Sequence, residues 1–220
     1  MPINKIDALI AAYNEEKTIK SVVTVLLKTS HINTIIIVDD GSVDKTSQVV
    51  KSIKSPKILL LKMPKNSGKS QAIAHGLSKV TTPNVFLCDA DLDGLTPKIC
   101  QSIIDPITNN RAKMSIGVRS FGVLTPTISY FFPSISGERA LNTDILKQCV
   151  KSNYFYNYGM ETVINYFCFI HKLKTVKRIF KYGHINHIKK DNFFKGLIFY
   201  SKQYLLIAKI YLHFLINGWN

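Results

Sequence analysis

Two hydrophobic patterns alternate along the first half of the chain. Short, nearly unbroken apolar runs predict strands at residues 5–12, 34–38, 57–62 and 84–89. Between them, apolar side chains three and four residues apart predict helices at 16–29, from Asp44 onward and at 67–80. Thr96 and Pro97 are typical of the start of a further helix. This order predicts an α/β fold with a mostly parallel, Rossmann-like sheet and helices on both faces.

The pattern is looser after residue 110. We expect a strand near 112–118, a helix from about Gly137, a second helix near 158–171 and a strand near 175–182. These elements extend the same domain, which we place at residues 1–191.

The C-terminal segment is apolar from 193 to 216, but Lys195, Lys202 and Lys209 interrupt it every seven residues. On a helix these lysines lie along one side, and a membrane-spanning helix needs about 20 residues nearly free of charge. The segment fits an amphipathic helix that lies at a membrane surface, or one that packs on the domain or on a second copy in a homodimer. We therefore predict a separate amphipathic helical tail at 192–220.

Composition agrees with a globular chain and adds a strong charge bias. The 220 residues are 46% hydrophobic and 20% charged, which is enough for one domain with a full core. The net charge is +15, and from Ile145 onward twelve Lys or Arg face only Glu161 and Asp191. Such a surface attracts phosphorylated substrates, anionic membranes or nucleic acid. No nucleic-acid-binding motif is present, so we expect no nucleic-acid partner.

The chain carries no sign of export. The first apolar run, at 6–13, is interrupted at once by Asn14, Glu15 and Glu16, unlike a signal peptide. The four cysteines form no CxxC pair and have no metal-ligand spacing, which favours a reduced compartment. We expect a cytoplasmic protein, with possible peripheral contact at the cytoplasmic membrane face.

Polar side chains that can carry chemistry follow the predicted strands. Tyr13 and Glu15 follow the first strand, Asp39 and Asp40 the second, Lys69 the third, and Asp89 and Asp91 the fourth. Because ligands of parallel α/β sheets bind beyond the carboxyl ends of the strands, we expect these groups to gather at one edge. Carboxylates so close together need a cation between them, and oxygen ligands suit Mn²⁺ or Mg²⁺. The sequence predicts a divalent-metal site that bridges a diphosphate.

Four motifs follow the predicted strands in order: AAYNEE at 11–16, VDDGSxDxT at 38–46, NxGK at 66–69 and DAD at 89–91. Together they resemble the motifs of family 2 glycosyltransferases with the GT-A fold, similar to dolichol-phosphate mannosyltransferase-like and glucosyl-phosphoglycerate synthase-like enzymes. The resemblance covers about the first 190 residues. It implies transfer of a sugar from a UDP- or GDP-linked donor to an acceptor hydroxyl or phosphate, with a lipid-linked acceptor among the alternatives.

The resemblance also implies roles for individual residues. Tyr13, Glu15 and Asp40, with Ala11 in the same nucleotide-sugar-binding set, hold the base and ribose, and Lys69 holds the diphosphate. Asp89 contacts the ribose or the sugar, and Asp91 binds the metal.

Three later segments resemble further elements of the family. The segment SGERAL at 136–141 is similar to an acceptor-side segment, and YGME at 158–161 to one that supplies an acid near the acceptor. In the segment 186–190, His187 would reach the metal, and Lys189 or Lys190 the diphosphate. Asp91 and Glu161 are the catalytic candidates. Glu161 would act as the base of an inverting reaction, with Glu138 in reserve, and the stereochemical outcome stays open.

Simpler roles are open for several of these residues. Asp39 and Asp40 could cap the turn into the next helix, Glu161 could be an ordinary ion-paired residue, and Arg139 could pair with a carboxylate. A second class of function is also open. The segment 65–70 resembles the end of a P-loop, so Lys69 and Asp89 could serve a nucleotide triphosphatase, although Met63 stands where a P-loop has glycine.

Overall fold

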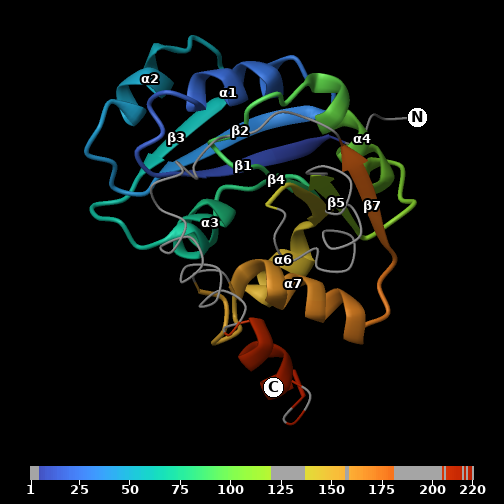
Figure 1. Cartoon of the computed structure of the whole chain (residues 1–220). Helices are drawn as coiled ribbons and strands as arrows, with labels where there is room; N and C mark the ends of the chain where they lie inside the picture. The colour runs from blue at the N-terminus through green and yellow to red at the C-terminus, as the bar shows by residue number, and fades with distance from the viewer. Residues whose placement is uncertain are drawn as a thin grey trace, which may run out of the picture.

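The part of the chain that the structure describes forms a seven-stranded sheet with helices on both faces (Figure 1). The computed structural model describes residues 5–119, 137–156 and 159–180, and in the C-terminal segment residues 205, 207–214, 216 and 218–219. The strand order is β3-β2-β1-β4-β6-β5-β7. The strands are β1 (Ile6–Ala12), β2 (Ile32–Asp39), β3 (Ile58–Lys62), β4 (Asn84–Leu87), β5 (Met114–Arg119), β6 (Arg139–Asn142) and β7 (Thr175–Phe180).

The first four strands form a parallel Rossmann-like half-sheet. β1 pairs in parallel with β2 and β4, and β2 pairs in parallel with β3. β6 pairs antiparallel with both β4 and β5, and β7 pairs in parallel with β5. The predicted α/β class with a mostly parallel sheet is therefore confirmed, with β6 as the strand of opposite direction.

Alternate residues of the strands point to opposite faces of the sheet and contribute to two separate hydrophobic cores. Leu9 and Ile36 pack against the helices α3 (Lys69–Leu77), α6 (Thr143–Cys149) and α7 (Gly159–Ile170). Ala8 and Ile37 point the other way and pack against α1 (Ile19–Leu27) and α4 (Pro97–Thr108), with α2 (Thr46–Ser52) beside α1 on this face. This period of two, with apolar side chains on both faces, explains why the strands appear in the sequence as continuous apolar runs.

The start of α4 follows from its capping chemistry. The Thr96 hydroxyl accepts a hydrogen bond from the Ile99 N–H, and Pro97 occupies the first turn, where no N–H partner is needed. All four cysteines are free and buried, in agreement with the absence of a CxxC pair.

The helix predicted from about Gly137 is wrong, because residues 139–142 form strand β6. Arg139 is the partner of Leu87 on one side and of Ile116 on the other, so both edges of this short strand are paired. The pairing overrides the helix preference of its Arg, Ala and Leu residues, which is only a weak bias. The helix begins after β6, where the Asn142 side chain caps α6 by accepting from the Asp144 N–H.

The C-terminal helical residues pack on α7 with one face. Ile207, Ile210 and Phe214 are buried, and the Tyr166 hydroxyl of α7 donates to the Phe214 carbonyl at 3.0 Å. The Tyr166 and Phe214 rings stack with centroids 4.5 Å apart. Leu205, Leu212 and Ile216 are exposed, at 69%, 59% and 71%. In the part of the chain that the structure describes, no helix is long and apolar enough to cross a membrane.

A buried aspartate ties three segments together at the edge where β1 begins. The Asp7 carboxylate accepts from the Asn33 amide, from the Thr34 N–H, and from the N–H groups of Thr81 and Thr82. Burial alone would raise the pKa of Asp7, but these hydrogen bonds outweigh it and hold the pKa below its ordinary value. The carboxylate therefore stabilises the fold in its ionised form.

Replacing this carboxylate tests its contribution. Asp7→Asn is expected to lower the free energy of unfolding at pH 7 by about 3 kcal/mol, since an amide nitrogen would face backbone donors. Because the folded pKa is depressed, the stabilisation is present above the unfolded pKa of about 3.9 and is lost as the pH falls through the folded value. Urea unfolding from pH 7 to pH 3 should show the difference from wild type shrinking. Asp144→Asn, at an aspartate whose side chain is 77% exposed, is the control. A difference that stays constant with pH would contradict this account.

Candidate active site

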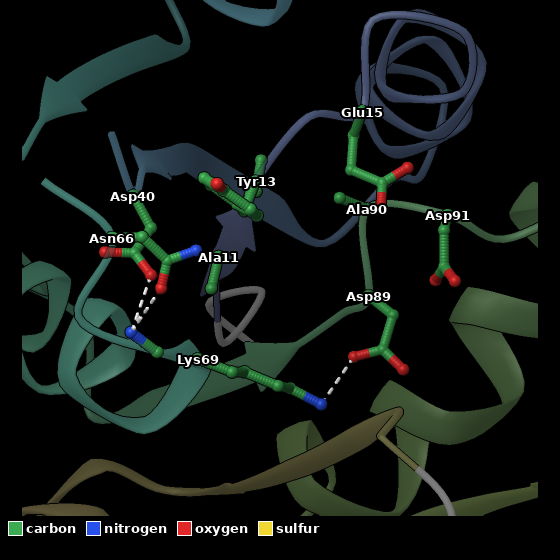
Figure 2. Close-up of a pocket in the computed structure, with 11 residues that line it drawn as sticks. Ala11, Tyr13, Glu15, Asp40, Asn66, Lys69, Asp89, Ala90 and Asp91 are labelled. Carbon is green, nitrogen blue, oxygen red and sulfur yellow. Dashed lines mark hydrogen bonds and ion pairs between the residues drawn. The ribbon is translucent and has the colours of Figure 1, made fainter. Parts of the chain in front are cut away.

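A cleft opens at the edge of the sheet where the parallel strands end. Its volume is about 340 Å³. It is lined by Ala11, Ala12, Tyr13, Glu15, Asp40, Asn66, Gly68, Lys69, Asp89, Ala90 and Asp91. Figure 2 shows Tyr13 on the wall between Asp40 and Glu15, with Lys69 and the two aspartates 89 and 91 toward the other end. The structure thus brings together, in one cleft, every predicted donor-site residue that it describes.

The loops after β1 and β2 are cross-linked on one side of this cleft. The Asn14 N–H donates to the Ser42 hydroxyl, and the Val43 N–H donates back to the Asn14 side-chain oxygen, both at 3.0 Å. The Glu15 N–H donates to the Thr46 hydroxyl at 2.8 Å. Asn14 has φ of 57°, a left-handed conformation that asparagine tolerates better than most residues. The two loops therefore form one unit that carries Tyr13 and Glu15.

The two acidic residues at the end of β2 both accept hydrogen bonds from backbone N–H groups. The Asp40 carboxylate accepts from the N–H groups of Ser67 and Gly68, each at 2.8 Å, and is 2% exposed. Asp39 accepts from the Ser42 N–H at 2.9 Å and from the Ser47 hydroxyl. Asp39 thus stabilises the turn that follows β2, in line with the alternative prediction that it caps this turn. Asp40 fixes the loop that leads into α3.

Lys69 is the central charge of the cleft. Its ammonium lies 2.7 Å from the Asp89 carboxylate and 2.9 Å from the Glu161 carboxylate (Figure 2 shows the first pair). Burial alone would lower the pKa of Lys69, but the two carboxylates outweigh it and raise the pKa above its ordinary value. The ammonium remains charged and joins α3, the segment after β4 and the first turn of α7.

Gly137 lies directly against the Asp89 carboxylate. A β-carbon added at Gly137 would overlap both carboxylate oxygens and the carbon between them. Because Lys69 holds Asp89 in place, the carboxylate could not move aside without breaking that ion pair. The sequence placed Gly137 only in a predicted helix start and an acceptor-side segment. The signal for its role was a glycine shortly before strand β6.

Glu138 and Arg139 point to opposite faces of the sheet. Glu138 is fully buried on the α4 side, where its charge raises the pKa of the Cys100 thiol in addition to the larger effect of burial. It does not line the cleft. Arg139 is also fully buried, but on the α7 side, where one guanidinium nitrogen donates to the Glu161 carbonyl at 3.3 Å and to the Asn165 side chain at 3.2 Å.

Asp91 lies at the end of the cleft beyond Asp89 (Figure 2). Among the described residues, no group of three or more His, Cys, Asp or Glu could hold a metal ion without further ligands. The predicted ligand His187, and the predicted phosphate-binding Lys189 with its neighbour Lys190, lie outside the described residues. An ion at Asp91 would therefore need oxygen ligands from elsewhere, and this matches the preference of Mg²⁺-like ions for one or two carboxylates together with substrate phosphates.

The geometry disfavours a P-loop. A P-loop turns successive backbone N–H groups toward a phosphate. Here the N–H groups of Ser67 and Gly68, directly before Lys69, donate to Asp40 instead.

Solved structures with the same architecture belong to glycosyltransferases. Glucosyl-3-phosphoglycerate synthase from Mycobacterium tuberculosis, in complex with phosphoglyceric acid, matches with a TM-score of 0.69 and 19% identity, over 86% of this chain and 74% of that chain. Its complex with Mn²⁺, uridine diphosphate and glucosyl-3-phosphoglycerate matches with a TM-score of 0.67 and 19% identity, over 84% and 73%. At this identity the likeness shows the fold alone, and that fold is the GT-A fold of nucleotide-sugar transferases.

The sequence assigns the family. The sequence model of the family described as Glycosyl transferase family 2 matches residues 7–164. The chain therefore belongs to this family of enzymes. The resemblance inferred from the four motifs is thereby confirmed.

Curated relatives match parts of the chain. A UDP-N-acetylglucosamine–dolichyl-phosphate N-acetylglucosaminyltransferase from Methanococcus voltae is 33% identical over 127 residues, which cover 50% of this chain and 50% of the relative. The uncharacterized glycosyltransferase YaiP from Escherichia coli K12 is 38% identical over 88 residues, 39% of this chain and 22% of the relative. The chain spans between 21% and 58% of the length of these and similar relatives.

The role of Asp40 can be tested without any ligand. Asp40→Ala leaves the N–H groups of Ser67 and Gly68 without their acceptor, so the free energy of unfolding should fall by about 2 kcal/mol. Hydrogen exchange at these two amides should accelerate more than in the rest of the cleft. Asp93→Ala, at an exposed aspartate in the segment after β4, should change stability by less than about 0.5 kcal/mol. Unchanged hydrogen-exchange rates at the amides of residues 67 and 68 would show that Asp40 does not hold this loop.

Proposed function

We propose that this chain transfers a sugar from a uridine diphosphate sugar to an acceptor. The observation that carries the proposal is that one cleft has both an aromatic ring in its wall and a cation held between carboxylates. A nucleoside diphosphate sugar has the matching parts, since its base is flat and its diphosphate is anionic. The family and the uridine nucleotides named for the similar transferases support the choice of donor.

In this proposal each wall of the cleft binds one part of the donor. The base stacks on Tyr13, which is 43% exposed, beside the Glu15 loop. Lys69 turns toward the diphosphate, and Asp89 accepts hydrogen bonds from sugar or ribose hydroxyls. Asp40 supports the site through the loop that it clamps, so its effect on the donor is exerted through Asn66 and Lys69.

A divalent ion fits the end of the cleft at Asp91. Asp91 would hold it together with diphosphate oxygens, and His187 is the protein ligand proposed to complete the set. The bound ion would supply positive charge to the departing diphosphate. Mn²⁺ is the ion named for the similar solved transferase, and we propose Mn²⁺ or Mg²⁺ here.

Glu161 is the acidic residue on the acceptor side in this proposal. It lies in the first turn of α7 with a side chain that is 9% exposed, next to the ammonium that would hold the diphosphate. If the reaction inverts the anomeric carbon, Glu161 would take the acceptor's proton. Glu138 is not proposed for this role, because it is buried on the other face of the sheet.

A thermal-shift panel of UDP, GDP and ATP, each with and without Mn²⁺, tests the proposal. UDP with Mn²⁺ at 100 times its Kd should raise Tm by about 5–10 °C, whereas UDP alone should raise it less. Asp91→Asn should abolish the metal-dependent part, because it removes a charged ligand, and Asp93→Asn should preserve it. A response to ATP alone that depends on Lys69 and is indifferent to Asp91 would favour the triphosphatase and overturn the transferase.

We further propose that the acceptor is lipid-linked and that the tail helix meets the membrane with its exposed face. Leu205, Leu212 and Ile216 are exposed on the side opposite the buried Ile207 and Phe214, with Lys209 beside them. An apolar stripe bordered by lysine suits an anionic membrane surface. The excess of basic residues after Ile145 and the dolichyl-phosphate in the relative's name support this acceptor class. The location that follows is peripheral, at the cytoplasmic membrane face.

Flotation with liposomes tests the membrane contact. The double variant Leu212→Ser, Ile216→Ser should reduce binding to anionic phosphatidylglycerol vesicles about tenfold or more, since it removes two inserted side chains. Ala208→Ser, at an exposed residue of the same helix, is the matched control. Equal binding of all three proteins would contradict the membrane role. A concentration-dependent dimer abolished by the double variant, without vesicle binding, would assign the stripe to a second copy instead.

A further inference from the structure

Arg139 is a buried cation directly behind the cleft. Among the described residues it is one of the largest side chains that are fully buried, and it stands at the first residue of β6, between Leu87 and Ile116. Burial in this position lowers the pKa of Arg139, although nearby carboxylates, Glu161 first among them, oppose the shift. Apolar side chains are often at least as stabilising as a buried charge, so the position of this charge calls for a specific role.

The contacts of Arg139 converge on one face of α7. Its guanidinium donates to the Glu161 carbonyl and to the side chain of Asn165, one helical turn later. From the same turn of α7, the Glu161 carboxylate reaches Lys69 at 2.9 Å, and Lys69 reaches Asp89 at 2.7 Å. Positive and negative groups thus alternate from the interior to the cleft, in the order Arg139, Glu161, Lys69, Asp89.

We propose that Arg139 is a positioning residue for the transfer site: it holds the first turns of α7 so that Glu161 meets Lys69, and it balances the charge of Glu161 when Lys69 turns to a bound diphosphate. The second half of this statement rests on the proposed function. The first half depends only on the contacts. Without Arg139, releasing Lys69 would leave the nearly buried Glu161 carboxylate with no adjacent cation among these four groups, at a large cost.

The first experiment measures how firmly Lys69 is held and requires no nucleotide. Amines acetylate in their uncharged form, so the rate at Lys69 relative to exposed Lys147, followed by mass spectrometry, reports the ion pairs around Lys69. Arg139→Met should misplace Glu161 and weaken its ion pair with Lys69, an effect that should outweigh the opposite effect of removing the Arg139 charge. The net result should be a Lys69 pKa lower by about one unit and an acetylation rate about tenfold higher. Asn165→Ala, which removes one of the two acceptors and keeps the charge, should raise it less. Met160→Leu, a change of similar volume at a fully buried residue in the same turn, should leave it unchanged.

The same rate decides whether Arg139 acts through Glu161. In a Glu161→Gln background the ion pair is already lost, so adding Arg139→Met should change the Lys69 rate by less than about twofold. An equal increase in both backgrounds, or no increase in the wild-type background, would overturn the positioning role. If Arg139→Met does not fold, Asn165→Ala provides the same comparison.

The second experiment tests the charge balance during binding, by calorimetry with UDP and Mn²⁺. Arg139→Met should weaken UDP affinity about tenfold in the wild-type background and less than about twofold in the Glu161→Gln background. Equal losses in both would show that Arg139 does not balance Glu161. If the wild-type protein binds no UDP with Mn²⁺, the proposed function fails, and the acetylation result still decides the positioning role.

Discussion

The Lys69 ammonium, held between Asp89 and Glu161, is the interaction on which the organisation of the cleft depends. It joins a helix N-terminus, a segment after the fourth strand and a helix that lies far along the sequence. One cation facing two carboxylates leaves an excess of negative charge, and this excess can be met from two directions. The interior supplies Arg139, and in the proposed function a divalent ion bound with the donor would supply positive charge from the cleft.

The reversed direction of β6 makes this arrangement possible. The parallel strands contribute side chains at their last residues, but β6 begins at the same edge and contributes at its first. The same short segment therefore supplies two contacts at the site. Gly137 lies against the Asp89 carboxylate, and Arg139 donates a hydrogen bond to the carbonyl of Glu161. Adjacent residues here serve opposite faces of the sheet: Glu138 lies on the α4 side, whereas Arg139 lies on the α7 side, behind the cleft.

The sequence predicted the features that depend on local pattern. The apolar runs and the helical spacing gave the parallel half of the sheet, and the positions of Tyr13, Lys69 and Asp91 after their strands gave the lining of the cleft. The strand β6 could not be predicted in this way, because its stability comes from pairing with β4 and β5, whose residues are far from it in the sequence. The occupied carboxylate of Asp40 and the close approach of Gly137 to Asp89 likewise arise only from the three-dimensional arrangement. The proximity of Glu161 to the cleft came from family resemblance, since its helical pattern alone is typical of an ordinary ion-paired residue.

The cross-linked loops after β1 and β2 have a consequence for the energetics of ligand recognition. Their hydrogen bonds, from Asn14 to Ser42, from Val43 back to Asn14 and from Glu15 to Thr46, are formed in the folded chain itself. The conformational entropy of ordering these loops is therefore lost on folding, and a ligand that stacks on Tyr13 does not have to order them again. That end of the cleft behaves as a rigid template that selects by shape. The flexible four-carbon arm of Lys69 makes the other end the adaptable part.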